Sequence, residues 1–320
     1  MSQSSQPRPR LHVLLASPRG FCAGVDRAIR IVQGALTQQH GKPVYVRHEI
    51  VHNRRVVENL EGEGAVFVEE LAEVPHGAPV VFSAHGVAKS VPADAARRGL
   101  SFLDATCPLV SKVHREAERH FAEQRHILMI GHAGHPEVEG TMGQLPPGAI
   151  TLIQSAEEAR RLIPPRADRL AFITQTTLSV EDAAEIVGIL RARFPSIEGP
   201  RKEDICYATT NRQMAVRAIA PECDLVIVIG SANSSNSQRL REVAERAGAP
   251  RAILLPEAGA LEWTALEGVG TLGLTAGASA PERLVEELIG ALADRYDLAL
   301  EERRVTRESV VFKLPAALVS

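Results

Sequence analysis

The chain has 320 residues, of which 45% are hydrophobic and 23% charged, and its formal net charge is -3. It can bury a substantial core, but it offers no basic surface for DNA, RNA or an anionic membrane, and aromatic residues at 4% are too few for base stacking. The longest apolar runs, such as Leu225–Ile229, have the length of buried strands, far below the ~20 residues of a membrane-spanning helix.

The cysteine content indicates a reducing compartment. Four widely spaced cysteines do not make a disulfide framework and are typical of metal binding or catalysis. The polar, proline-containing segment 1–10 has no apolar core, so we interpret it as a loose tail rather than a secretory signal. We therefore expect a cytoplasmic protein with no nucleic-acid or membrane partner.

The first third of the chain begins with an apolar strand from Leu11, a turn that carries Cys22, and a helix. The helix is expected to bury one apolar stripe: Val25, Ile29, Val32 and Leu36. Two more short strands are expected, each ending in a polar loop with a histidine. The strands are Pro43–His48 and Pro79–Ser83, and the histidines are His52 and His85.

The second third repeats this order around Cys107. A strand from Ser101 leads into the turn, and Pro108 suits the first position of the helix that follows. The expected apolar stripe of that helix is Val110, Val113, Ala117 and Phe121. A helix N-terminus lowers the pKa of a thiol, and the thiolate is the form that binds metal. A single cysteine at such a place is, however, usually a small buried apolar side chain. Two later strands open into polar loops: His126–Ile130 into 131–140 and Leu170–Ile173 into 174–177.

The last third follows the same order from Cys206. Thr209 or Thr210 is expected to cap the next helix. Strands at Asp224–Ile229 and Thr271–Leu274 again open into polar loops, 230–237 and 275–279.

The spacing of these features indicates a threefold repeat. Cys22 lies 30 residues before His52, and Cys107 and Cys206 each lie 28 residues before His135 and Ser234. Strands that alternate with helices form parallel sheets, whose ligands bind beyond the carboxyl ends of the strands. We therefore expect three such crevices to form one central site. The alternative is a generic α/β protein whose loops are polar because they meet water, and the repeated spacing favours the site.

Three thiolates without a fourth at an equivalent place suggest an iron-sulfur cluster with one open position. Clusters bound by four cysteines are coordinatively closed and transfer electrons. Zinc bound by three cysteines and a histidine is the competing interpretation, but structural zinc sites usually take ligands in short local pairs, and this sequence has none. Cys223, at the start of a strand, is expected to serve in packing.

The strand-end loops are rich in hydrogen-bond donors, which predicts a phosphate or diphosphate pocket. The candidate residues are His52, His85, His135, Ser234, Ser235, Asn236 and Ser279. There is no Walker or GxGxxG motif to support nucleotide binding. Glu137 is the carboxyl best placed to face the site, whereas Glu139 is expected to cap or to face solvent. A structural role is expected for His12, His76, His114 and His126.

From about residue 11 to residue 315, the chain resembles the 4-hydroxy-3-methylbut-2-enyl diphosphate reductase (IspH/LytB) family. The motifs that carry the resemblance are Pro18-Arg-Gly-Phe-Cys-Ala-Gly-Val-Asp-Arg-Ala28, His52-Asn53, Ser83-Ala-His-Gly86, Asp104-Ala-Thr-Cys-Pro108, Gly131-His-Ala-Gly-His-Pro-Glu137, Thr174-Gln-Thr-Thr177, Cys206-Tyr-Ala-Thr-Thr-Asn211, Ser234-Ser-Asn236 and Ala276-Gly-Ala-Ser279. The family's reaction turns an allylic diphosphate alcohol into isopentenyl and dimethylallyl diphosphates, with two electrons and two protons and loss of water. It is the last step of the non-mevalonate isoprenoid pathway.

The resemblance implies an α/β fold of three pseudo-threefold-related domains with small parallel sheets, a trefoil around a central [4Fe-4S] cluster. It implies one cluster per chain, bound by Cys22, Cys107 and Cys206, with one iron not ligated by cysteine. The diphosphate would be bound by His52, His85, Ser234, Asn236 and Ser279, and the substrate hydroxyl would meet His135, Thr176 and Glu137. Electrons are expected from a ferredoxin or flavodoxin, because no flavin or nicotinamide motif is visible, and a monomer is expected.

The predicted domains are residues 11–103, 104–202 and 203–298, followed by a tail, 299–320, that folds back on the body with a strand at Val310–Leu314. Two other functions remain open at this point. One is a non-redox dehydratase in which the open iron only polarises a hydroxyl, and the other is a redox sensor with an exposed cluster. A sensor needs an output module, and the sequence contains no evident DNA-binding or partner helix.

Overall fold

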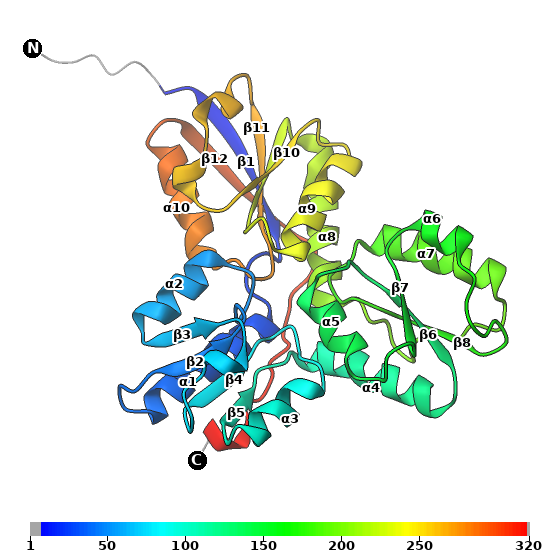
Figure 1. Cartoon of the computed structure of the whole chain (residues 1–320). Helices are drawn as coiled ribbons and strands as arrows, with labels where there is room; N and C mark the ends of the chain where they lie inside the picture. The colour runs from blue at the N-terminus through cyan, green and yellow to red at the C-terminus, as the bar shows by residue number, and fades with distance from the viewer. Residues whose placement is uncertain (1–7, 319–320) are drawn as a thin grey trace, which may run out of the picture. The chain divides into compact units, whose positions relative to one another are not determined.

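The structure is a computed structural model that describes residues 8–318. Its contacts divide the chain into two compact units, which we call unit 1 (Met1–Cys22 with Ala208–Ser309) and unit 2 (Ala23–Tyr207 with Val310–Ser320). The described strands form three sheets in which all neighbouring strands run parallel (Figure 1). The predicted α/β class with three small parallel sheets is therefore confirmed. Within the described range, no helix is long and apolar enough to cross a membrane.

Unit 1 is built on a five-stranded sheet in the order β10-β9-β11-β1-β12. Its strands are β1 (Arg10–Ser17), β9 (Leu225–Ile229), β10 (Ala252–Leu255), β11 (Thr271–Ala276) and β12 (Asp297–Arg304). Helix α10 (Glu282–Ala293) covers one face, and α8 (Tyr207–Ile219) and α9 (Ser235–Arg246) cover the other (Figure 1). Because successive side chains of a strand point to opposite faces, Val13 packs toward α10 and Leu14 toward α8 and α9.

Unit 2 contains the other two sheets. The four-stranded sheet, in the order β3-β2-β4-β5, consists of β2 (Val44–Arg47), β3 (Ala65–Val68), β4 (Pro79–Phe82) and β5 (Ser101–Asp104). Its helices are α1 (Ala23–Gln38), α2 (Arg54–Gly62) and α3 (Ser90–Arg97). The three-stranded sheet, in the order β7-β6-β8, consists of β6 (His126–Ile130), β7 (Ile150–Ile153) and β8 (Leu170–Thr174).

Helices cover both faces of the three-stranded sheet. They are α4 (Pro108–Ala122) and α5 (Pro136–Met142) on one face, and α6 (Ala156–Arg161) and α7 (Val180–Arg193) on the other. Strand β6 is buried along its whole length, which explains its continuous apolar sequence. The described residues also include five short 3-10 helices: Leu71–Glu73, Ala220–Glu222, Ala258–Ala260, Trp263–Leu266 and Ala316–Leu318.

The strand that leads to Cys22 joins the sheet of the last third of the chain. Strand β1 pairs with β11 and β12, and not with the strands that directly follow it in the sequence. The strand before Cys107, β5, likewise pairs with the earlier strand β4. Two of the three cysteines thus follow strands that belong to the sheet formed by the preceding third in cyclic order. The domain limits 11–103, 104–202, 203–298 and 299–320 stay a prediction.

Two predictions about helices were wrong. Phe121 is 41% exposed, whereas the neighbouring His120 is fully buried on the apolar side of α4. Positions 110, 113, 117 and 120 share one face of a helix of 3.6 residues per turn, so the stripe turns to His120. Thr209 and Thr210 lie inside α8 instead of capping it, because the helix already begins at Tyr207, directly after Cys206.

The two ends of the chain also differ from expectation. Val310–Leu314 has no regular secondary structure, and the C-terminal strand is β12 at Asp297–Arg304. Residues 1–7 of the predicted loose tail lie outside the described residues, but Arg10 already opens β1 and the Pro9 carbonyl accepts a hydrogen bond from the Asp297 amide at 2.9 Å.

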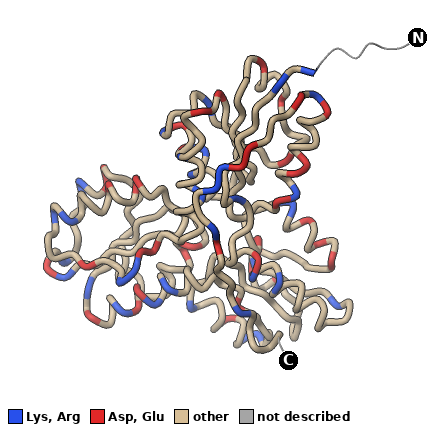
Figure 2. The backbone as a smooth tube through the Cα atoms, turned by 180° about the vertical axis from the view of Figure 1, so that it is seen from behind, with Lys and Arg blue, Asp and Glu red and all other residues tan. Residues whose placement is uncertain are grey.

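Charge marks β12 as the edge of the five-stranded sheet. The strand ends in Glu301-Glu302-Arg303-Arg304, seen in Figure 2 as an acidic stretch followed by a basic one. Arg303 also pairs with Glu222 at 3.1 Å. Charged side chains on an edge strand oppose pairing with another chain, which protects the open edge of this sheet.

Gly273 in β11 tests the packing beneath Cys223. A Cβ at this position would lie 2.8 Å from the Cys223 Sγ and 2.9 Å from a methyl group of Val226. We predict that Gly273→Ala lowers the free energy of unfolding by about 1 to 3 kcal/mol through overpacking. The control is Gly290→Ala in α10, where a Cβ meets no atom within 4 Å. It should raise stability by about 0.5 to 1 kcal/mol, because alanine is the better helix former. Equal effects of the two changes in denaturant titrations would contradict the packing described here.

Candidate functional site

Each of the three predicted ligand cysteines is fixed through its backbone to a neighbouring strand-end loop. The amide N–H of each cysteine donates to a carbonyl oxygen: Cys22 to Ala278 (3.2 Å), Cys107 to Ala84 (3.0 Å) and Cys206 to Thr176 (3.1 Å). These loops follow β11, β4 and β8. They carry Ser279, His85 and Thr176, so every cysteine is joined to a predicted substrate-binding loop of its own unit.

The cysteines suit metal binding in their exposure and local structure. None of the three is in a disulfide, and each is partly exposed. Cys107 is the N-cap residue of α4, with Pro108 at the first helical position as predicted. Cys206 directly precedes α8. Cys22 and the pair Cys107 and Cys206 belong to different units, and each is anchored within its own unit.

Cys223 lies in the hydrophobic core of unit 1, as predicted. It is 4% exposed, and its Sγ donates to the Ile219 carbonyl at 3.1 Å. Burial raises the pKa of this thiol to about 12, with the neighbouring acids Glu222 and Asp224 adding to the effect. A thiol that stays protonated is a poor metal ligand.

Three histidines predicted as site residues come together in unit 2. The rings of His52 and His85 are stacked with centroids 4.0 Å apart, and His135 lies edge-on to both, at 5.5 and 5.8 Å. Burial lowers the pKa of His85 well below the usual histidine range, and the neighbouring His52 and His135 act in the same direction. Burial also lowers the pKa of His135 to about 3. Without a bound anion, His85 and His135 are therefore neutral.

The hydrogen bonds of His135 define its tautomer. His135 caps α5, and its Nδ1 lies 3.1 Å from the backbone nitrogen of Glu137. A backbone amide can only donate, so Nδ1 is the acceptor, and the proton of the neutral ring lies on Nε2. His135 can therefore offer an N–H to a ligand from its other ring nitrogen.

Glu137 is a buried carboxyl held by one residue. It is 2% exposed, its Oε1 accepts from the Thr176 amide at 2.6 Å, and its Oε2 accepts from the Thr176 hydroxyl at 2.9 Å. Burial raises the pKa of Glu137 to about 7, although both hydrogen bonds from Thr176 act to lower it. Glu137 can thus hold or release a proton near neutral pH, as a general acid must. Glu139 is exposed, as expected.

Unit 1 places three more predicted residues at the start of α9. Ser234, Asn236 and Ser279 are 3%, 5% and 7% exposed, and the hydroxyl oxygens of Ser234 and Ser279 lie 3.4 Å apart. Ser235 is partly buried beside them. The Asn236 Oδ1 accepts from the Ala278 amide at 2.8 Å, but its buried Nδ2 has no hydrogen-bond partner within residues 8–318. A buried donor left in this way at a helix N-terminus suits an anionic ligand.

Sequence reasoning missed two residues that build these loops. Ser237 is fully buried and donates its hydroxyl to Ser234 at 3.1 Å, and its Oγ occupies the space that a Cβ on Gly230 or Gly277 would need. The Asp204 carboxylate accepts from the Thr174 amide at 3.0 Å. Its place two residues before Cys206 resembles that of Asp104 before Cys107, which was the only sequence signal for it.

The remaining histidines have structural partners or lie at the surface. His12 pairs with Glu301 at 3.3 Å, and the His126 Nε2 contacts the Thr151 hydroxyl at 2.7 Å. The His114 ring packs against Gly86, and His76 is exposed. These places agree with the structural roles expected for them.

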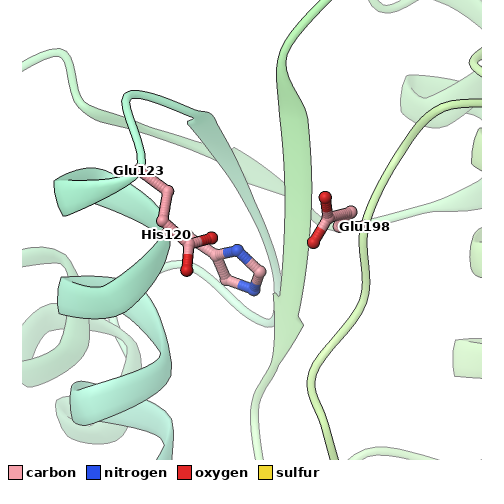
Figure 3. Close-up of side chains that lie close together, drawn as sticks. All are labelled: His120, Glu123 and Glu198. Carbon is pink, nitrogen blue, oxygen red and sulfur yellow. The ribbon is translucent and has the colours of Figure 1, made fainter.

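A second group of potential metal ligands lies at the end of α4. His120, Glu123 and Glu198 place one ligand atom each within 4.8 Å of one another (Figure 3). Arg125 forms ion pairs with both carboxylates, and Arg119 lies 3.3 Å from Glu123. Because arginines already compensate both acids, we assign this group to an ion-pair network that joins α4 to the segment after α7.

Comparison with known proteins identifies the family. The model of the LytB protein family matches residues 13–293. A 4-hydroxy-3-methylbut-2-enyl diphosphate reductase from Gluconobacter oxydans is 72% identical over 312 residues, which cover 96% of this chain and 93% of the relative. The chain belongs to the LytB family.

Solved structures of LytB-family reductases share the fold. The E-1-hydroxy-2-methyl-but-2-enyl-4-diphosphate reductase from Plasmodium falciparum is 37% identical, with a TM-score of 0.91 and 97% coverage of both chains. A second reductase structure, of the terminal enzyme of the non-mevalonate pathway, is 30% identical with a TM-score of 0.62. It covers 89% of this chain and 99% of its own. The family resemblance found in the motifs is therefore confirmed.

The raised pKa of Glu137 has a consequence for stability. Between the ordinary pKa of 4.5 and the folded value of about 7, the folded state keeps a proton that the unfolded state has lost, so stability falls as pH rises. Glu137→Gln removes this dependence. We predict that the stability of the variant relative to wild type increases by about 2 kcal/mol from pH 5 to pH 8. The measurement is denaturant unfolding at matched iron content, and a pH-independent difference would mean that Glu137 is already ionised at pH 5.

Proposed function

We propose that the chain is a 4-hydroxy-3-methylbut-2-enyl diphosphate reductase. It converts (E)-4-hydroxy-3-methylbut-2-enyl diphosphate into isopentenyl and dimethylallyl diphosphates, the last step of the non-mevalonate (methylerythritol phosphate) isoprenoid pathway. One observation carries the proposal: the buried acid Glu137, with a pKa of about 7, is held by Thr176, whose carbonyl accepts the amide N–H of Cys206. A proton donor is thereby built onto the same loop as a thiolate ligand.

Cys22, Cys107 and Cys206 would hold one [4Fe-4S] cluster per chain, with one iron left without a cysteine. Their fit to this group rests on partial exposure, the absence of disulfides among them and the helix N-terminus at Cys107. When bound, such a cluster supplies electrons and an iron able to accept an oxygen ligand.

Two sets of side chains would grip the diphosphate. In unit 2 they are His52, His85 and His135, and in unit 1 they are Ser234, Ser235, Asn236 and Ser279. The unpartnered Nδ2 of Asn236 and the N-terminus of α9 supply donors without adding charge. An anion beside His85 and His135 raises their pKa values, so binding draws protons into the site and turns neutral donors into cations.

The reaction replaces a C–O bond by a C–H bond and consumes two electrons and two protons. One proton goes to the departing oxygen, which leaves as water, and the other goes to the allylic carbon fragment. Glu137 is placed to give the first. Its Oε1 faces the Thr176 amide, so in the neutral acid the proton lies on Oε2, next to the Thr176 hydroxyl. Thr176 and His135 then orient the hydroxyl of the substrate.

A ferredoxin or flavodoxin would supply the electrons. The family reaction needs two of them, and the sequence contains no motif for a bound flavin or nicotinamide. We place the protein in the cytoplasm as a monomer, since its thiols need a reducing compartment to stay available for iron.

The central test is an anaerobic assay with the allylic diphosphate and reduced ferredoxin or a chemical reductant. We predict isopentenyl and dimethylallyl diphosphates as products, no turnover without reductant, and a loss of at least ~100-fold in turnover for Glu137→Gln, the usual scale for removing a general acid. The variant should keep its iron and its affinity for substrate. Turnover that is independent of reductant would favour the dehydratase, and near-normal turnover by Glu137→Gln would move the proton source elsewhere, such as the substrate's own diphosphate.

The ligand assignment is tested by four serine variants. Cys22→Ser, Cys107→Ser and Cys206→Ser should each lose most of the bound iron, while Cys223→Ser keeps it, because only Cys223 is fully enclosed in apolar packing. Iron per chain and the visible absorption of anaerobically purified protein give the answer. An equal loss of iron in the Cys223 variant would refute the three-ligand assignment.

A further inference from the structure

A buried arginine of α8 holds the loop before Cys22. The side chain of Arg212 is fully buried, and its Nε and Nη2 donate to the Gly20 carbonyl at 3.0 and 2.7 Å. Nη2 also donates to the Phe21 carbonyl at 3.2 Å, and Glu308 supplies the opposite charge at 3.0 Å. Gly20 and Phe21 directly precede Cys22, so one guanidinium fixes both peptide units that lead to the thiol.

Arg27 of α1 does the same for the loop before Cys107. Its Nη1 donates to the carbonyls of Ala105 and Thr106, at 3.3 and 3.1 Å. Its Nε donates to the carbonyl of Lys313 at 2.9 Å. The carbonyls that Arg27 holds again belong to the two residues directly before the cysteine.

Lys112 of α4 holds the loop before Cys206. Its Nζ donates to the carbonyl of Glu203 at 2.7 Å and to that of Lys202. It also pairs with the fully buried carboxylate of Asp204 at 2.9 Å. An ammonium has three donors, and all three are used on this one loop.

The three contacts follow one rule of connectivity. The cations lie five, five and six residues after a cysteine, on the helix that this cysteine precedes: Arg27 after Cys22, Lys112 after Cys107 and Arg212 after Cys206. Each cation holds the loop of the next cysteine in the order Cys22, Cys107, Cys206 and back to Cys22. Each contact lies within a single unit, and together they close a cycle along the chain.

We propose that Arg27, Lys112 and Arg212 are positioning residues that fix the three cysteine loops for the iron-sulfur cluster. The inference rests on the proposed function, because it takes the three cysteines as ligands of one group. A carbonyl held on one side of a peptide unit points the amide of the next residue to the other side. The cations thus cooperate with the bonds from each cysteine N–H to Ala278, Ala84 or Thr176.

The positive charges also have an electrostatic role. Thiolates that gather around a cluster repel one another, and a cation about one helical turn from each thiolate offsets part of that repulsion. Arg212 and Lys112 carry acidic partners, Glu308 and Asp204, which keep them charged inside the protein.

The test uses Arg27→Met and Lys112→Met in the full-length, anaerobically reconstituted protein. Hydrogen exchange, read by mass spectrometry, should become about tenfold faster or more around Cys107 in Arg27→Met, and around Cys206 in Lys112→Met, with little change at the other loop. Iron should pass to a chelator several-fold faster in both variants. Arg212 is left unchanged, because removing a fully buried guanidinium would leave Glu308 unpaired and destabilise unit 1 as a whole.

The matched controls are Arg30→Met and Arg115→Met, which remove an exposed cation three residues further along the same helices. Both should match wild type in exchange and in iron release. Wild-type protein that holds iron alongside unchanged variants would overturn the positioning role, and so would faster exchange in every cysteine loop at once. Wild-type protein that takes up no iron would instead overturn the proposed function.

Discussion

The backbone hydrogen bond from each cysteine amide to the neighbouring strand-end loop is the constraint on which this site depends. A sulfur atom is placed only as well as the peptide unit that carries it, and Cys22, Cys107 and Cys206 all use the same bond. The bond does more than position a thiol. It joins each ligand loop to a loop that carries Ser279, His85 or Thr176, so a metal ligand and a substrate contact move together. A site assembled from distant parts of the chain gains accuracy from such joints.

The protonation states in the site also follow from burial. His85 and His135 lose their charge on burial, whereas Glu137 keeps its proton, so the groups that face an anionic ligand begin almost uncharged. A diphosphate then brings its own charge to a set of neutral donors that can become cations. Neutral rings also explain how His52 and His85 can stack at 4.0 Å without repulsion.

Much of the fold and the site could be predicted from the sequence, because both leave short-range signals. Pro108 after Cys107 marks a helix start, and continuous apolar runs such as Leu225–Ile229 mark strands covered on both faces. What could not be predicted depends on contacts distant in the sequence. The partners of β1 lie more than 250 residues away, and the carbonyls held by Arg212 have no sequence signature of their own. Thr209 was mistaken for a cap because a helix that begins directly after a cysteine gives no capping signal.

The position of β1 in its sheet has a consequence for how the protein is made. Strand β1 leaves the ribosome first, yet its neighbours β11 and β12 are synthesised only near the end of the chain. Until then the strand that leads to Cys22 has two unpaired edges, and closing so large a loop is entropically costly and slow. The loops of Cys107 and Cys206 can form earlier, around sheets whose strands lie close in sequence. Iron that arrives during synthesis would therefore find two thiols in place before the third, and cluster insertion has to wait for the last strand.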